Sequence, residues 1–277
     1  MLSRVADSLY WMSRYLERAE HTARLLAVHL NLVLDLPETT AETRRAMLMD
    51  LLGGDEAAAV DDDDALFTLL TFDLQNPNSI LGCVRAAREN ARQVREQINL
   101  EMWQELNELY LMLGKAQGSK EWAERNVELC EEVIERAQLF AGITDGTMLH
   151  GQGWHFIRLG CHLERANASA RLLAAESRVL WAEQPSKVYA DQPVFLEWLA
   201  LLRAHAAFEA YSKVYTFDLQ PALIAEFLLL NREFPRSLAS AAAGVQEALT
   251  AIAEATGAPK SNRASRIAGR LRASLDY

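Results

Sequence analysis

Apolar residues near the start of the chain recur at alternating spacings of four and three positions. The series consists of Val5, Leu9, Met12, Leu16, Ala19, Ala23, Leu26, Leu30 and Val33. This period places every member on one face of an α-helix, so we predict a single long helix over residues 2–35. Pro37 ends it, because proline cannot continue a helix. The narrow apolar seam is typical of antiparallel bundle packing at shallow crossing angles.

The same pattern returns 147 residues later in the chain. Residues 16–26 read LERAEHTARLL and residues 163–173 read LERANASARLL, so eight of eleven positions are identical. Alanine and leucine matches are common between helices, whereas charged residues in register are not. The charged matches pair Glu17, Arg18 and Arg24 with Glu164, Arg165 and Arg171. We therefore predict an internal duplication, with one repeat over residues 1–142 and a second over 143–277. The two halves would pack as one compact unit about a pseudo-twofold axis.

Two further similarities place the later helices of the halves in different registers. Residues 76–81 (NPNSIL) resemble residues 234–239 (FPRSLA) at a shift of 158, with proline near a helix start in both. Residues 71–75 (TFDLQ) recur letter for letter at residues 216–220, a shift of 145. We favour the proline register because a long helix is predicted after it in both halves. The sequence leaves both registers open.

The remaining helices follow from the same periodicity. They are predicted over residues 41–52, 63–72, 79–116, 119–140, 146–182, 193–214, 219–230, 235–256 and 262–275. Ser119 is a suitable N-cap for the helix over 119–140. Residues 142–146 contain two glycines and an aspartate, which predicts the turn between the halves. The expected fold class is all-α, a helical bundle built from two duplicated halves.

Composition limits the possible classes of function and the cellular compartment of the protein. The net charge of −10 argues against broad nucleic-acid binding, which depends on neutralising many phosphates. The three cysteines lack Cys-x-x-Cys spacing and fit reduced thiols rather than a disulfide framework. The start of the chain has no signal-peptide pattern, and no apolar run approaches the ~18–20 residues of a membrane span. We expect a soluble, cytoplasmic protein with no membrane segment.

Sequence signatures of the common catalytic and cofactor sites are absent. The sequence has no Glu-x-x-His pair, no His-Glu-x-x-His, no Gly-x-Ser-x-Gly and no phosphate-binding Gly-x-x-x-x-Gly-Lys. The densest histidines, His150, His155 and His162, are five and seven residues apart, and only the last two could share a helix face. We therefore predict no catalytic residue, no bound metal and no organic cofactor.

The repeated Glu-Arg pair is the remaining candidate site. Neighbouring helix positions diverge by about 100°, so Glu17 cannot readily pair with Arg18. The surrounding residues change between the copies, since Arg14 and His21 correspond to Cys161 and Ala168. A motif retained while its helical neighbours change suggests partners on another helix.

Three interpretations of the motif remain open. In the structural one the motif helices face each other, so that Glu17 pairs with Arg165 and Glu164 with Arg18. In the functional one a charged cleft between the halves binds a carboxylate, a phosphate or a peptide end through arginine. The third is ordinary surface charge. The possible binding residues are Glu17, Arg18, Arg24, Glu164, Arg165 and Arg171.

These residues resemble the bacterial alpha-E family, a helical domain with a Glu-Arg motif that usually occurs as a tandem duplication. The resemblance covers essentially the whole chain and rests on residues 15–20 (YLERAE), 76–80 (NPNSI), 87–92 (ARENAR), 101–103 (EMW), 145–148 (DGTM) and 162–166 (HLERA). Family members are typically encoded beside circularly permuted ATP-grasp ligases, transglutaminase-like proteins and a proteasome-like N-terminal-nucleophile peptidase. The resemblance implies a part in peptide synthesis or modification and assigns no reaction to the helical protein itself.

Three function hypotheses follow from the residues and the resemblance together. The leading one is a non-catalytic binding or scaffold component that partners an ATP-grasp-type carboxylate–amine ligase or a transglutaminase-like protein from the same gene cluster. The second is an enzyme of amide chemistry that uses Glu17 or Glu164 as acid or base, although arginine neighbours favour the ionised form. The third is a purely structural oligomer. The sequence assigns neither a substrate nor an oligomeric state.

Overall fold

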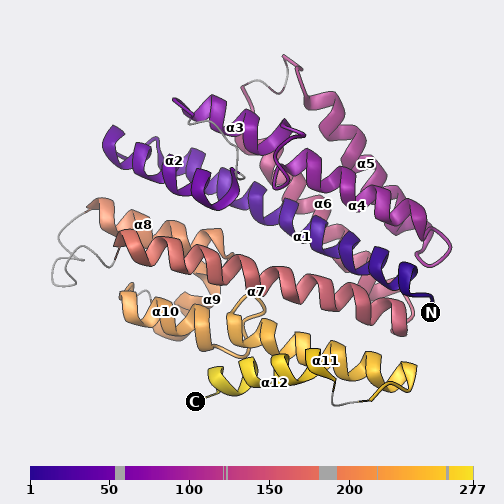
Figure 1. Ribbon diagram of the computed structural model, residues 1–277. Coiled ribbons are helices and arrows are strands. Elements are labelled where there is room, and N and C mark those ends of the chain that lie inside the picture. Colours follow the sequence, from indigo (N-terminus) through magenta and orange to yellow (C-terminus); the bar gives the residue numbers. More distant parts are fainter. Residues whose placement is uncertain are drawn as a thin grey trace.

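The computed structural model describes residues 1–53, 60–120, 122, 124–180, 192–216, 218–259 and 262–276, with the side chains of 177–180 and 192–194 excluded. Over these residues the protein is built from helices and contains no strand, which confirms the all-α prediction (Figure 1). The helices are α1 (Ser3–Leu32), α2 (Glu38–Leu52), α3 (Asp63–Phe72), α4 (Ile80–Gln93), α5 (Leu100–Ala116), α6 (Asn126–Thr147), α7 (Gln152–Leu180), α8 (Gln192–Ala204), α9 (Phe208–Tyr215), α10 (Pro221–Leu230), α11 (Leu238–Thr256) and α12 (Arg263–Leu275).

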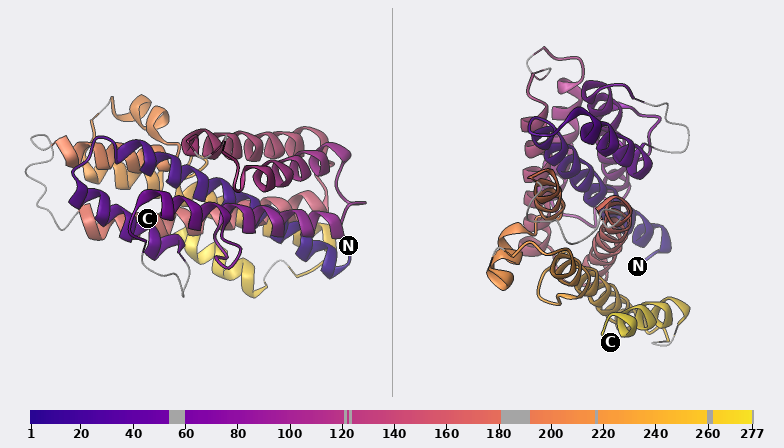
Figure 2. Two further views of the ribbon diagram at one scale, coloured as in Figure 1. Left: turned by 90° about the horizontal axis from the view of Figure 1, so that it is seen from above. Right: turned by 90° about the vertical axis from the view of Figure 1, so that its left-hand side faces the viewer.

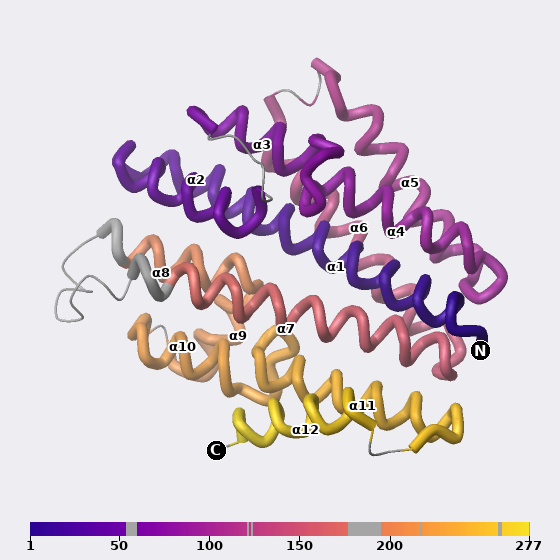
Figure 3. The backbone as a smooth tube through the Cα atoms, in the orientation of Figure 1, coloured from indigo at the N-terminus to yellow at the C-terminus, as the bar shows by residue number. Residues whose placement is uncertain are grey.

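The two long motif helices, α1 and α7, lie side by side through the middle of the molecule and run in the same direction (Figure 3). At their N-terminal ends the Met1 amino group donates to Gln152 Oε1 at 3.1 Å. Further along, Arg165 Nε lies 2.7 Å from Glu17 Oε1. Helix α1 packs in the expected antiparallel direction against α4. Ser8 near the start of α1 bonds Gln93 at the end of α4, and Thr22 further along α1 bonds Asn78 just before α4. The other motif helix, however, is a parallel neighbour.

The other helices cover the α1–α7 pair from two sides (Figures 1 and 2). Helices α3 to α6 lie on the α1 side, and α11 and α12 lie on the α7 side. Helix α11 runs antiparallel to α7, because Gln152 Nε2 donates to Ala255 O at one end and Ser169 Oγ to Arg236 O nearer the other. Each motif helix therefore packs against an antiparallel helix from its own half of the chain.

Contacts at the start of α4 and α11 follow the proline register. Thr22 Oγ1 donates to Asn78 O at 3.2 Å, and Ser169 Oγ donates to Arg236 O at 3.0 Å. The next residue caps the helix in each case: Ser79 Oγ accepts from Gly82 N, and Ser237 Oγ from Ser240 N. In the rival register, residue 217 lies outside the described residues. The duplication itself and the pseudo-twofold axis remain predictions.

Two predicted helices are each divided in the structure. The span 79–116 forms α4 and α5, and Asn99 caps the second of them by accepting from Met102 N at 2.9 Å. The span 193–214 forms α8 and α9, which are separated at residues 205–207, where Ala206 has a φ of 52°. A left-handed residue ends an α-helix, since its carbonyl and amide no longer point along the axis.

The predicted turn at residues 142–146 is wrong, because α6 continues through both glycines to Thr147. Phe140 and Thr144 are buried on one face of this helix, whereas Gly142 and Gly146 have no outside atoms near a hypothetical Cβ. Burial of one face offsets the roughly 1 kcal/mol that each glycine costs in a helix. The start was also misplaced, since α6 begins at Asn126 and its N-cap position is held by Arg125 rather than Ser119.

Most buried apolar side chains belong to one core that includes α1, α4, α5, α6 and parts of α7 to α10. A small separate cluster beneath α12 contains Leu159, Val245, Ala248 and Ala268. Within the described ranges, no helix combines the length and the apolar character needed to cross a bilayer.

Candidate functional site

The motif helices approach each other closely at Gly160. A Cβ at this position would overlap Ser13 Oγ and the backbone oxygen of Tyr10 on α1. Ser13 and Gly160 are themselves 147 positions apart, the same shift that relates the two motifs. Small residues on both helices therefore bring the motif turns within side-chain reach of each other.

The two motifs form reciprocal ion pairs across this contact. Arg165 donates to Glu17 through Nε (2.7 Å to Oε1) and Nη2 (3.1 Å to Oε2). Arg18 donates to Glu164 in the same way, through Nε (2.7 Å to Oε1) and Nη2 (3.2 Å to Oε2). Both pairs have the two-point geometry that fits a guanidinium to a carboxylate. The pairing predicted from the sequence is confirmed.

Each motif glutamate also bonds a second arginine, and these two arginines lie in different segments of the chain. Glu164 accepts from Arg14 on α1, with Nε at 2.7 Å and Nη2 at 2.6 Å from Oε2. Glu17 accepts instead from Nη1 of Arg236, at 3.3 Å, and this residue precedes α11. The Cys161 thiol, 147 positions after Arg14, donates to Glu17 Oε2 at 3.1 Å.

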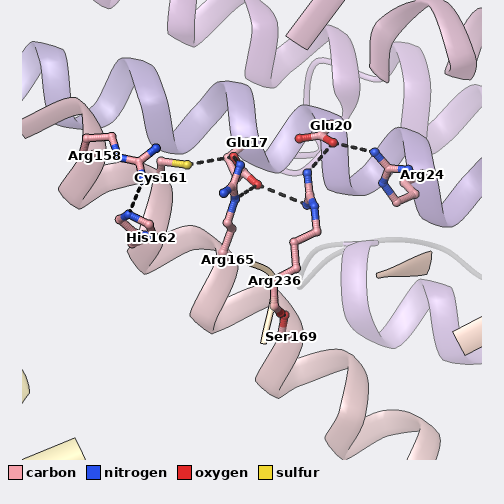
Figure 4. A network of polar contacts seen from close by, with 9 residues as sticks. All are labelled: Glu17, Glu20, Arg24, Arg158, Cys161, His162, Arg165, Ser169 and Arg236. Carbon is pink, nitrogen blue, oxygen red and sulfur yellow. Dashed lines mark hydrogen bonds and ion pairs between the residues drawn. The ribbon is translucent and has the colours of Figure 1, made fainter. Parts of the chain in front are cut away.

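The Glu17 side of the contact extends into a larger network (Figure 4). Arg236 bridges Glu17 and Glu20, since its Nη2 lies 2.5 Å from Glu20 Oε1. Arg24 donates to the same oxygen at 2.7 Å from one turn further along α1. The loop before α11 is thereby attached to α1 through two carboxylates.

Burial and charge oppose each other in setting the pKa of Glu17. Burial alone raises the pKa of this carboxyl, but Arg165 and Arg236 outweigh that effect and lower it to about 2. Burial also raises the pKa of the Cys161 thiol, and the neighbouring Glu17 raises it further. At neutral pH Glu17 is therefore a carboxylate and Cys161 a thiol.

The network carries surplus positive charge. Five arginines face three carboxylates, an excess of two charges; the members are Arg14, Arg18, Arg24, Arg165, Arg236, Glu17, Glu20 and Glu164. Arg24 pairs with Glu20 rather than with Glu17. Arg171, its counterpart in the second motif, donates to the Leu51 carbonyl at 2.6 Å. These two arginines share the sequence pattern of the motif but do not take part in the reciprocal pairs.

A cleft that is open to solvent lies between α1, α6 and α7 on the Glu17 side of the network, and its cavity volume is about 80 Å³. The apolar part of its lining includes Leu16, Phe140, Trp154 and Ile157. Its charged part comprises Glu17, Glu20, Asp145, Arg158, Arg165 and Arg236. Apolar walls with a few charged groups are the usual composition of a ligand-binding surface.

The three neighbouring histidines do not converge. His150 stacks on Trp154 with ring centroids 4.1 Å apart, and His155 meets the same ring edge-on. His162 packs against α11, where a Cβ on Gly244 would lie 2.6 Å from its ring. In the part of the chain that the structure describes, no three metal-ligating side chains lie close enough to hold an ion.

Sequence reasoning missed four residues that bond the motif or its neighbours. The sequence shows that Arg14 and Cys161 differ at corresponding positions of the two motifs. It does not show which carboxylate each side chain contacts. Arg236 appeared only as a departure of FPRS from NPNS. Glu20 had no signal at all, since its counterpart in the second motif is Asn167.

Comparison with known proteins agrees with the helical fold and the motif. A family model named Alpha-E, described as a predicted alpha-helical domain with a conserved ER motif, matches residues 1–277. Uncharacterized protein Mb2597 of Mycobacterium bovis is 28% identical over 256 residues, and Uncharacterized protein Rv2567 of Mycobacterium tuberculosis is 27% identical. Each alignment covers 85% of this chain but only 28% of the relative. No solved structure shows a significant match.

Proposed function

Because the chain belongs to the Alpha-E family of helical domains with a conserved Glu-Arg motif, we propose that it is a non-catalytic binding and scaffold component of a peptide-synthesis or peptide-modification system. Its partner is an ATP-grasp-type carboxylate–amine ligase, and its place of action is the cytoplasm. The two halves of the chain descend from one duplicated unit, a proposal supported by the shared motif and by the matching contacts that begin α4 and α11.

The observation that carries this proposal is the internal neutralisation of both motif glutamates. Glu17 is 8% exposed and Glu164 is 3% exposed, and each is held by two guanidiniums from elsewhere in the chain. Removing one partner of such a pair leaves an unpaired buried charge. The motif therefore joins α1 to α7 and fixes their relative position.

The same geometry weighs against acid or base catalysis by the motif. An efficient general base has a pKa near the working pH, whereas that of Glu17 is about 2. Glu164 has both oxygens engaged by Arg14 and Arg18. Neither carboxylate has the free oxygen that proton transfer from a substrate requires.

The length of the relatives supports a partner. This chain corresponds to 28% of each aligned mycobacterial protein, so a unit of this kind shares a polypeptide with a much larger remainder there. A domain that is covalently joined to another in one protein can act on a separate chain in another, since the linkage only raises the local concentration. The ligase partner itself follows from the gene neighbourhood that the family resemblance implies.

The test is reconstitution with the ATP-grasp-type protein encoded beside this chain. We expect the two proteins to co-purify and the rate of ADP release to rise on adding this chain, while the chain alone releases none. Glu17→Gln should leave that stimulation intact whenever the variant remains folded by circular dichroism. Failure to bind the ligase, with binding to the neighbouring transglutaminase-like protein instead, would contradict the proposed partner. Loss of turnover in folded Glu17→Gln, with ligase binding retained, would contradict the non-catalytic role.

A further inference from the structure

We propose that the cleft between α1, α6 and α7 binds the C-terminal carboxylate of a short peptide with apolar side chains, and that Arg158 is the residue that recognises this carboxylate. The inference names a ligand class for the binding component proposed above and rests on that function for its biological setting. The binding itself concerns only this chain.

Arg158 is held in place without being neutralised. Its guanidinium lies over the Trp154 ring at 5.5 Å, and Nη2 donates to His162 Nε2 at 2.9 Å. Burial, together with Arg158 and Arg165, lowers the pKa of His162 to about 3, so this ring is neutral and its Nε2 accepts the hydrogen bond. Among the described residues no carboxylate pairs with Arg158, in contrast to Arg165 and Arg236 in the same cleft.

The supports of Arg158 form a regular series along one face of the chain. His150, Trp154, Arg158 and His162 are spaced by four residues, so each lies about one helical turn from the next. His150 stacks on Trp154, and His162 is fixed against Gly244 of α11. Such support orders the guanidinium before a ligand arrives, which reduces the entropy lost on binding.

The electrostatic surroundings favour an anion. Behind Arg158, the network of Glu17, Glu20 and their arginines carries an excess of positive charge. The only other carboxylate in the lining is Asp145 on α6, whose side chain is 65% exposed and therefore well screened by water. A carboxylate can take the Nε and Nη1 donors of Arg158, which bond no described residue.

The rest of the lining fits a peptide rather than a bare anion. Leu16, Phe140 and Ile157 supply apolar walls, and these would pack against aliphatic or aromatic side chains. From Trp154 to Arg165 the cleft follows eleven residues of α7, about 16 Å along the axis. An extended peptide rises about 3.3 Å per residue, so about five residues span this length and a tripeptide covers part of it. The Trp154 Nε1–H, which is buried and has no described partner, supplies one donor for a peptide carbonyl.

Calorimetric titration of this chain alone tests the inference. The probe is N-acetyl-Ala-Leu-Phe with a free carboxylate, compared with the same peptide as its C-terminal amide. We expect the acid to bind at least about tenfold more tightly than the amide, because a charge-assisted pair with arginine is lost in the amide. Higher salt should reduce this difference.

Two pairs of variants separate the site from general effects. Arg158→Gln should reduce acid binding to the level of the amide. Arg125→Gln should not, although Arg125 also lies over a tryptophan ring, Trp122, at 5.1 Å. Ala141→Trp should block the cleft from the α6 side, whereas Leu139→Trp, an exposed position on the same helix outside the lining, should leave binding unchanged.

The inference is overturned if neither peptide binds, if acid and amide bind alike, or if Arg158→Gln binds the acid normally. Inorganic phosphate that displaces the acid with equal affinity would also overturn it, since that indicates a simple anion site. None of these results bears on ligase binding or ADP release, so the proposed function stands or falls separately. Conversely, the chain could bind the acid specifically and yet neither bind the ligase nor change its ADP release. That result would support the cleft and contradict the proposed partner.

Discussion

Arg14 and Cys161 lie 147 positions apart, and each contacts the motif glutamate of the facing helix: Arg14 Nε donates to Glu164, and Cys161 Sγ donates to Glu17. One position thus keeps its contact while its side chain changes from a long cation to a short thiol. The cleft is lined by Cys161 and not by Arg14. The shorter side chain leaves room beside Glu17 that a second arginine on α7 would fill.

The reciprocal pairs predict a large effect of Arg165→Ala on stability. The variant leaves Glu17 buried with Arg236 as its remaining arginine, and Arg236 is farther away, at 3.3 Å. Breaking a buried pair costs about 3–5 kcal/mol, so we expect the free energy of unfolding to fall by about 3 kcal/mol in urea denaturation. Glu17→Ala should add little to Arg165→Ala in the double variant, because the pair is already broken.

The control for this prediction is Arg92→Ala, which removes an exposed pair with Glu89 on α4. Water screens the charges of an exposed pair, so this variant should unfold almost like the wild type. Equal effects of Arg165→Ala and Arg92→Ala would show that the motif does not hold the helices together.

The close approach of α1 and α7 predicts that Gly160→Ala is strongly destabilising. The new Cβ would overlap Ser13 Oγ and the backbone of Tyr10, so the helices must separate. Overpacking of this kind typically costs about 1–3 kcal/mol, which thermal unfolding would detect. Ser13→Gly should not restore stability, because the overlap with the Tyr10 carbonyl remains.

Gly142→Ala is the matched control, since Gly142 is also helical but has open space around it. There the substitution should stabilise by about 0.5–1 kcal/mol through helix propensity alone. A stabilising Gly160→Ala would mean that α1 and α7 do not pack as described.

A second buried charge cluster predicts a pH-dependent stability. Arg44 of α2 contacts two buried carboxylates, Glu176 of α7 and Glu197 of α8. Burial raises the pKa of Glu176 to about 7; Arg44 opposes this and the neighbouring Glu197 adds to it. One guanidinium thus contacts two carboxyl groups, and the Glu176 carboxyl remains protonated up to about neutral pH.

The raised pKa sets the direction of the effect. Between pH 4.5 and about 7 the folded state keeps the Glu176 proton and the unfolded state loses it, so stability falls as pH rises through this range. Relative to Glu176→Gln, the wild type should lose ~3 kcal/mol across this interval in denaturation curves. Histidines titrate in both proteins and cancel from the difference. A difference that does not change with pH would contradict a protonated Glu176.

The capping serines predict a smaller, local effect. Ser79 and Ser237 are fully buried and accept from the amides of Gly82 and Ser240. Replacing either by alanine should cost about 1 kcal/mol, the usual value of an N-cap. Ser119→Ala is the control, because no described helix begins directly after Ser119, and this substitution should have almost no effect on the melting temperature. A similar loss in all three variants would contradict the capping assignment.

Periodicity predicted the helices well but not all of their ends. Over residues 94–99 the apolar pattern continues while the backbone turns, and the useful signal was Asn99, a good cap that lay inside a predicted helix. Gly142 and Gly146 led to the opposite error, a turn predicted inside a helix. The packing of Phe140 and Thr144 outweighs the low helix propensity of glycine. When one face of a helix covers the core, the free energy gained by burying that face outweighs the helix propensity of individual residues.

The reciprocal pairs were predictable because a repeated motif constrains its own partners. Arg236 could not be placed in the same way, since it reaches Glu17 across 219 positions and lies outside the two Glu-Arg motifs. The cleft was equally hidden, because Phe140 and Arg158 look like ordinary helical residues until α6 and α7 are brought together.

The pairing of α1 with α7 also has a consequence for synthesis of the chain. Glu17 and its partner Arg165 are 148 residues apart. At about 5–20 residues per second, the ribosome completes that distance in about 7–30 s. During this interval α1 can pack against α4 and α6, but Glu17 still lacks Arg165, and the surface around Tyr10 and Ser13 still lacks the turn of α7 at Gly160 that covers it. A growing chain of this protein is therefore exposed longest along α1, which is where a nascent-chain chaperone would find it.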